Sequence, residues 1–233
     1  MRFPAPLVEG TLIRRYKRFL ADVTLPDGAE VVAHCPNPGR MTSCAYPGGK
    51  VLLSPAMNPK RKLKWTWEIA YAGETAILVN TSRPNGVVGE ALAAKQVPGL
   101  EAYTSIKPEV KYGEKSRIDF LLTGEGLPNA YVEVKSVSLL VEPGLAAFPD
   151  AVTARGRKHL EELMAMKTAG HRAVMVFLLS RGDADRIRPA DEIDPAYGKT
   201  LRVAVAAGVE LIGLRGVITP DSMTVSGTVP IDL

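Results

Sequence analysis

The sequence contains little cysteine, histidine and tryptophan, and it lacks a long apolar run. Cys35 and Cys44 are the two cysteines, and with His34 alone beside them they form neither a disulfide framework nor a zinc-ligand pattern. No stretch approaches the roughly 18 apolar residues of a membrane-spanning helix, and residues 1–6 lack the apolar segment of a signal peptide. These absences predict a cytoplasmic protein with reduced thiols and no membrane partner.

The overall charge is modest but unevenly distributed. Hydrophobic residues make up 46% of the 233 residues and charged residues 23%, a globular composition that excludes wholesale disorder. Residues 1–80 carry 11 Lys and Arg against 6 Asp and Glu, whereas residues 81–233 carry 18 against 19. Such an asymmetry indicates a segment that faces nucleic acid or a membrane, with a solvated basic surface as the alternative.

The first 80 residues are typical of a small β-barrel. Short β-rich runs occur at residues 11–25, 31–33, 51–53, 63–71 and 76–79, with turn residues between them and no convincing helix. Five strands in this length predict an OB-like barrel, a fold that often binds oligonucleotides. Spacing alone does not separate it from an SH3-like barrel.

The rest of the chain alternates helical and strand patterns. The polar segment 80–85 marks the domain boundary, which predicts domains over residues 1–80 and 81–233. We expect helices at about 85–96, 152–169 and 195–207, and strands at 104–112, 116–123, 130–139, 173–180 and 210–214. The predicted fold is therefore an N-terminal five-stranded OB-like barrel followed by an α/β domain with a central mixed sheet.

Two carboxylates and a lysine are candidates for catalytic chemistry. Glu133 and Lys135 lie two apart on a predicted strand, so they share one face. A hairpin centred on Gly126 places Asp119 opposite Glu133, with Cβ atoms about 4.5–5.5 Å apart. Carboxylates this close repel each other unless a cation lies between them, and their hard oxygens suit Mg²⁺ or Mn²⁺. Lys135 would stabilise developing charge or orient a water, although a surface pair with Glu133 is the plainer alternative.

Asp119 followed after 13 residues by Glu133-Val134-Lys135 resembles the motif of the PD-(D/E)xK nuclease superfamily, although Ile118 replaces the usual proline. Nearly the whole chain resembles the sugar fermentation stimulation protein A (SfsA) family, in the strings His34–Met41, Arg117–Leu121, Tyr131–Val137 and Phe148–Gly156. The resemblance implies an OB-like domain joined to a PD-(D/E)xK nuclease-like domain. It also implies non-specific DNA binding and a regulatory role in maltose metabolism.

Further candidates lie on the predicted helices. The superfamily often places a glutamate on its first core helix, where Glu90 matches by position and would complete the metal site; an ordinary exposed glutamate is the alternative. Arg155, Arg157, Lys158 and His159 begin the next helix, where cations oppose the helix dipole. Contact with DNA phosphates would explain them, with a general-acid role for His159 or a solvated charged turn as alternatives.

The barrel contributes candidate DNA contacts of its own. Arg40 ends a turn that could face an anion. A basic stretch next to Trp65 combines phosphate neutralisation with aromatic residues, as single-strand grooves do; its members are Lys60, Arg61, Lys62 and Lys64. Alternation places Trp65 and Trp67 on the apolar face, so we expect both in the core and the cations alone as contacts.

These patterns, together with the resemblance, predict a DNA-binding protein with a metal-dependent nuclease-like site that hydrolyses phosphodiester bonds with Mg²⁺ or Mn²⁺. The DNA would be double- or single-stranded. The alternative is a non-specific DNA-binding regulator of sugar or maltose metabolism without turnover. A carbohydrate-linked enzyme or sensor is suggested by the family name alone. Exposed strands of a nuclease core would allow a homodimer.

Overall fold

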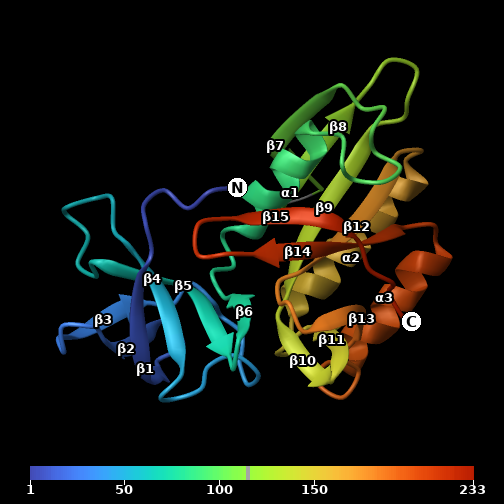
Figure 1. The fold of residues 1–233 in the computed structure, drawn as a ribbon. Coiled ribbons are helices and arrows are strands. Elements are labelled where there is room, and N and C mark those ends of the chain that lie inside the picture. The colour runs from blue at the N-terminus through green and yellow to red at the C-terminus, as the bar shows by residue number, and fades with distance from the viewer. Residues whose placement is uncertain (114–115) are drawn as a thin grey trace.

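The computed structural model describes residues 1–113 and 116–233 and consists of two packed domains (Figure 1). The first domain contains β1 (Val8–Tyr16), β2 (Leu20–Thr24), β3 (Glu30–His34), β4 (Lys50–Pro55), β5 (Trp65–Ala72) and β6 (Thr75–Leu78). The strand order is β3-β2-β1-β4-β5-β6, and a parallel β3–β5 pairing closes β1 to β5 into a five-stranded barrel. The predicted OB-like barrel is confirmed.

The strands of the barrel differ in detail from those predicted. The run at 11–25 is a hairpin of two strands, and β6, predicted as the fifth strand, extends the sheet beyond the closed ring. The hairpin turn has Lys17 and Arg18 at positive φ, 47° and 63°. Such a backbone costs about 1–2 kcal/mol per non-glycine residue. Because Lys17 and Arg18 form this turn, it has none of the glycine, asparagine or proline residues by which a turn is usually identified in a sequence.

Four of the barrel strands contribute apolar side chains to a common core. Leu12, Val23, Leu53 and Trp67 are buried together, and the Trp67 indole N–H donates to the Ile69 carbonyl at 3.0 Å. Trp65 packs against this cluster from a partly buried position. The expectation that both tryptophans serve the core is confirmed.

Glu68 of β5 carries a carboxylate, yet its side chain is fully buried. Arg83 donates to its two carboxylate oxygens at 2.5 and 3.0 Å, Ser54 Oγ donates at 2.7 Å and Asn80 Nδ2 at 2.8 Å. A buried carboxylate is tolerated when it is paired and hydrogen-bonded in this way. The network ties the barrel to the segment that enters α1 (Pro84–Ala93), because Arg83 is the residue preceding that helix.

The second domain is built on a six-stranded mixed sheet of order β15-β14-β12-β9-β8-β7. Its strands are β7 (Ser105–Tyr112), β8 (Ser116–Thr123), β9 (Ala130–Val137), β12 (Arg172–Leu179), β14 (Glu210–Ile218) and β15 (Met223–Thr228). A second sheet, not predicted from the sequence, contains β10 (Leu139–Glu142), β11 (Gly144–Phe148) and β13 (Ala184–Pro189). The confirmed fold class is thus a barrel followed by a mixed α/β domain.

Helices cover both faces of the large sheet. β12 lies between β9 and β14 and is buried on both sides, as its apolar run predicted. Val174 and Val176 share a core with α1, whereas Met175 and Phe177 share another with the opposite helices. Those helices are α2 (Ala154–Thr168) and α3 (Pro195–Ala206). None of the described helices is long and apolar enough to cross a membrane.

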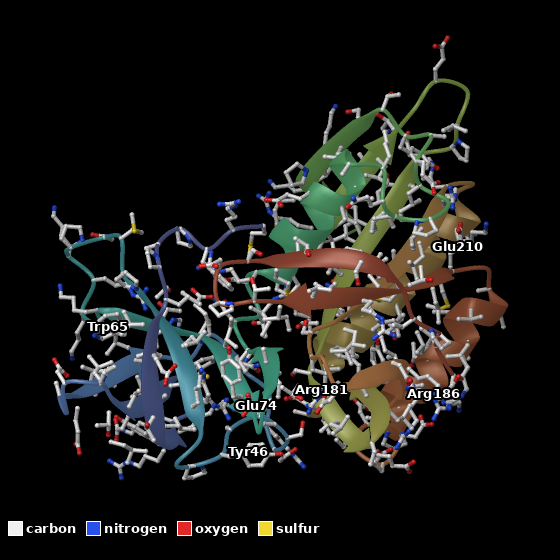
Figure 2. All side chains as sticks on the ribbon, viewed as in Figure 1. Tyr46, Trp65, Glu74, Arg181, Arg186 and Glu210 are labelled. Carbon is white, nitrogen blue, oxygen red and sulfur yellow. The ribbon has the colours of Figure 1, made fainter. Side chains whose placement is uncertain are left out.

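Buried polar contacts hold the two domains together. Arg181, at the junction in Figure 2, donates to the Ser138 carbonyl at 2.6 Å and the Ser43 carbonyl at 3.3 Å, and pairs with Asp183 at 2.5 Å. The Leu78 N–H of β6 donates to the Ser180 carbonyl at 2.9 Å. The barrel is therefore positioned against the edge at which β9 and β12 end.

Candidate active site between the two domains

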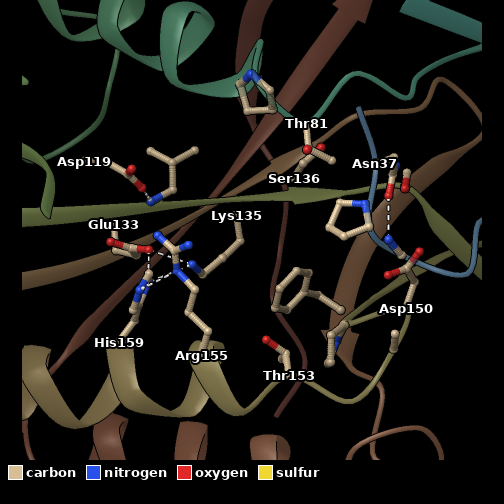
Figure 3. Close-up of a pocket in the computed structure, with 18 of the residues that line it drawn as sticks. Asn37, Thr81, Asp119, Glu133, Lys135, Ser136, Asp150, Thr153, Arg155 and His159 are labelled. Carbon is tan, nitrogen blue, oxygen red and sulfur yellow. Dashed lines mark hydrogen bonds and ion pairs between the residues drawn. The ribbon is translucent and has the colours of Figure 1, made fainter. Parts of the chain in front are cut away.

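A cavity of about 890 Å³ lies where the domains meet, and both contribute to its wall (Figure 3). The barrel supplies Arg18 and the turn at 37–39, and the second domain supplies the start of α1, the middle of β9 and the first turns of α2. The ionisable residues that line it include Asp119, Glu133, Lys135, Asp150, Arg155, Lys158 and His159. The three residues of the predicted motif thus share one cavity.

The β8–β9 hairpin brings the motif together as its symmetry predicted. Phe120 pairs with Val132 and Leu122 with Ala130, so the hairpin is centred on Gly126, which adopts a positive φ of 69°. Asp119 lies one residue beyond this ladder, and its Oδ2 accepts the Val134 N–H at 2.7 Å. The same register places Asp119 beside Glu133.

Glu133 lies on the floor of the cavity. Its side chain is 2% exposed, and its Oε1 accepts from Lys135 Nζ at 2.6 Å. His159 Nδ1 also contacts Oε1 and lies 3.1 Å from Lys135 Nζ (Figure 3). Among the described residues, Glu133 Oε2 has no hydrogen-bond partner although it is buried. An unpaired buried carboxylate oxygen is costly, which makes this atom the strongest indication of an additional ligand in this cavity.

The cavity separates the proton affinities of the two carboxyls. Burial and then the negative charge of Glu133 raise the pKa of Asp119, despite the Val134 N–H and Lys135. Burial alone would raise the pKa of Glu133, but the His159 ring and the Lys135 charge bring it below its ordinary value. Mutually repelling carboxylates of this kind favour a bound cation.

The donor set fits a hard divalent cation. Within the described ranges, no group of three or more His, Cys, Asp and Glu side chains gathers as a metal cluster. Asp119 and Glu133 alone would supply side-chain oxygens, and Mg²⁺ is commonly held by one or two carboxylates with water and phosphate oxygens completing the shell. The orphaned Oε2 of Glu133 is consistent with this arrangement.

Glu90 does not line this cavity. It lies on α1 with its side chain 63% exposed, and pairs at 2.5 Å with the amino group of Met1. Asn85 reaches the site instead, because its Nδ2 donates to Asp119 Oδ1 at 2.7 Å. The helix predicted to start at about residue 85 starts at Pro84, with Arg83 at the N-cap, so Asn85 lies inside its first turn.

The four predicted DNA contacts of α2 separate in the structure. Arg155 and Lys158 line the cavity, and Arg155 Nε lies 3.3 Å from His159 Nε2. Arg157 turns away and pairs with Asp194 at 3.2 Å. His159 is 5% exposed, so it contacts Glu133 and Lys135 rather than the surface. Arg155, Lys158 and the largely buried His159 thus line the cavity, and Arg157 does not.

The predicted contacts of the barrel lie outside the cavity. Arg40 is exposed, and its carbonyl accepts from Arg15 at 3.3 Å. The other four residues belong to the loop between β4 and β5, which projects on the left of Figure 1, away from the second domain. Arg61 in that loop donates to Thr66 Oγ1 at 2.8 Å, and Lys64 Nζ donates to the Pro59 carbonyl at 2.6 Å.

Neutralising this loop is expected to flatten the salt dependence of DNA binding if the loop contacts the backbone. Each phosphate contact that is lost reduces the magnitude of the negative slope of log K against log salt by about 0.7–0.9. The measurement is fluorescence anisotropy over a salt series with the variant in which glutamine replaces Lys60, Arg61, Lys62 and Lys64. A slope identical to that of the wild type would remove the loop from the interface.

Sequence reasoning did not identify the contact between Gly39 and Asp150. Arg15 Nη2 donates to the carbonyls of Asn37 and Gly39, both at 2.8 Å, and thereby fixes the turn. Asp150, between β11 and α2, accepts the Met41 N–H at 3.2 Å. The carboxylate packs so closely on Gly39 that a Cβ there would overlap it. A glycine in a turn is too common for the sequence to reveal such a long-range contact.

Gly39→Ala is therefore expected to lower the free energy of unfolding by about 1–3 kcal/mol, the usual cost of overpacking. Urea denaturation measures it. Gly182→Ala is the matched control, because its added Cβ would meet only a Thr75 methyl at 3.9 Å. The double variant with Asp150→Ala should recover part of the stability, since it removes the overlapping carboxylate. Equal stability of Gly39→Ala and wild type would contradict the contact.

The fold and site define a class of two-domain protein, in which an OB barrel and a mixed α/β domain enclose a cavity with an Asp, Glu and Lys motif. The model described as the SfsA N-terminal OB domain matches residues 13–79, and the one described as the sugar fermentation stimulation protein RE domain matches residues 82–222. The chain belongs to the sugar fermentation stimulation protein (SfsA) family.

Individual relatives agree with this assignment. A sugar fermentation stimulation protein homolog from Acidithiobacillus ferrooxidans is 50% identical over 97% of this chain and 97% of the relative. A homolog from Paramagnetospirillum magneticum is 53% identical over 100% of this chain and 98% of the relative. A solved structure, described as Pyrococcus furiosus SfsA in complex with Ca²⁺, matches with a TM-score of 0.88 and 26% identity, covering 100% of this chain and 98% of that chain.

Proposed function

We propose that the protein binds DNA and hydrolyses its phosphodiester bonds at the cavity between the domains, with Mg²⁺ or Mn²⁺ held by Asp119 and Glu133. The observation that carries the proposal is the buried Oε2 of Glu133, which has no partner in the described structure and belongs to a carboxylate whose charge raises the pKa of Asp119. The relative from Pyrococcus furiosus is described as a complex with Ca²⁺, another hard divalent cation, which supports cation binding by this chain.

Each side chain of the site has a defined task in this proposal. When bound, the cation supplies positive charge to the phosphate and favours deprotonation of an attacking water. Lys135 Nζ lies beside Glu133 and is available to orient that water or to stabilise charge on the phosphate oxygens. His159 holds Glu133 and Lys135 in place from α2. Asn85 and the Val134 N–H orient Asp119.

The reaction is a displacement at phosphorus. The water oxygen forms a bond to phosphorus, one bridging P–O bond breaks, and the departing oxygen takes up a proton. Arg155 and Lys158 line the same cavity and are positioned to hold the phosphates that flank the bond.

Incubation of the purified protein with plasmid, single-stranded and branched DNA tests the proposal. Cleavage products should form with Mg²⁺ or Mn²⁺ and disappear with chelator. Absence of products under every metal condition would overturn the hydrolytic function. Retained salt-sensitive binding in that case would favour the non-specific DNA-binding regulator.

A further inference from the structure

The depth of Glu133 restricts what form of DNA can reach it. Its side chain is almost completely buried, and the open cleft above it is lined by the barrel and by α2. A volume of about 890 Å³ falls within the range of sites that enclose small ligands. Single-stranded nucleic acid is bound in basic grooves that follow its backbone.

The tip of the β1–β2 hairpin places a cation at this cavity and carries an exposed aromatic side chain at the next residue. Arg18 lines the cavity from the barrel, and Arg155 and Lys158 line it from α2. Phe19 follows it and is 44% exposed, although large apolar side chains are usually buried. Lys17 and Arg18 both adopt positive φ, where asparagine and glycine are ordinarily favoured. The tip thus displays long cationic side chains in a backbone conformation that disfavours them.

We propose that the cavity admits a single unpaired DNA strand and that the hairpin tip is its contact surface on the barrel. Arg18 binds a backbone phosphate, and Phe19 stacks on a base next to it. A positively charged groove combined with an exposed aromatic ring is the usual chemistry of single-strand binding. The inference rests on the proposed function for the identity of the ligand, but it concerns binding and not turnover.

Fluorescence anisotropy with the full-length protein tests this surface. The probes are a 5′-fluorescein-labelled 15-nucleotide oligodeoxythymidine and a blunt duplex of equal length, in Ca²⁺ and, in parallel, in chelator. We expect the single strand to bind at least tenfold more tightly than the duplex. Arg18→Gln should flatten the salt slope for the single strand by about 0.7. Phe19→Ala should weaken its binding about five- to tenfold, the lower range for loss of one stacked base.

Lys199→Gln, which removes an exposed cation of α3 outside the cavity, is the matched control and should bind like the wild type. Equal affinity for duplex and single strand, or unchanged binding by both hairpin variants, would overturn the inference. An oligouridine of the same length that binds more tightly than the DNA would replace the ligand by RNA. Because binding is read apart from cleavage, lack of cleavage would overturn the proposed function and leave this inference standing.

Discussion

Replacing Lys135 by methionine is expected to lower the rate of single-turnover DNA cleavage by about 100-fold or more. The side chain keeps its approximate length but loses the ammonium group that lies 2.6 Å from Glu133 Oε1. Loss of one group that stabilises transition-state charge costs about 10²–10³-fold in rate. Asp119→Asn should have an effect at least as large, because it removes one of the two carboxylates proposed to hold the cation.

The control for Lys135→Met is Lys107→Met. Lys107 is exposed on β7 of the same sheet and does not line the cavity, so cleavage by its variant should match the wild type. Rates are measured with enzyme in excess over labelled DNA, and thermal unfolding confirms that each variant is folded. A folded Lys135→Met protein that cleaves at the wild-type rate would contradict the role of Lys135.

Replacing Arg83 by methionine is expected to lower the free energy of unfolding by about 3–5 kcal/mol, because it leaves the fully buried Glu68 without its charged partner. Ser54 and Asn80 would remain as partners but carry no charge. Adding Glu68→Gln should recover part of the stability, since the unpaired charge is then removed. Urea denaturation of the wild type, Arg83→Met, Glu68→Gln and the double variant completes a double-mutant cycle.

Arg188→Met provides the matched comparison. Arg188 pairs with Glu192 at 2.8 Å, but that pair is solvated and is expected to contribute no more than about 1 kcal/mol. Similar decreases for Arg83→Met and Arg188→Met would show that the Glu68 network does not stabilise the domain junction as described.

The parts of the site that could be predicted depend on local register. A turn centred on Gly126 and strict alternation along β9 determine which side chains face each other, so Asp119, Glu133 and Lys135 followed from the sequence. The apolar run of β12 likewise identified the centre of the sheet, because a strand covered by helices on both faces needs no polar side.

The remaining parts depend on contacts between distant segments. Arg18 reaches the cavity because the barrel is docked against β9, and no local pattern around a hairpin turn without glycine indicates this. Glu90 matched a superfamily position, but its side chain follows the exposed face of α1 to the Met1 amino group. Glu68 alternates with Trp67 and Ile69 along β5, and this alternation does not reveal that Arg83, which precedes α1, pairs with it.

Binding of Mn²⁺ is the measurement that tests the central claim most directly, since every step proposed for the site depends on a cation at Asp119 and Glu133. Isothermal titration calorimetry of the wild type should give one Mn²⁺ per chain, and Glu133→Gln should abolish that binding while Asp185→Asn, which alters an exposed carboxylate, leaves it intact. Absence of binding to the wild type, or binding that Glu133→Gln does not change, would contradict the account.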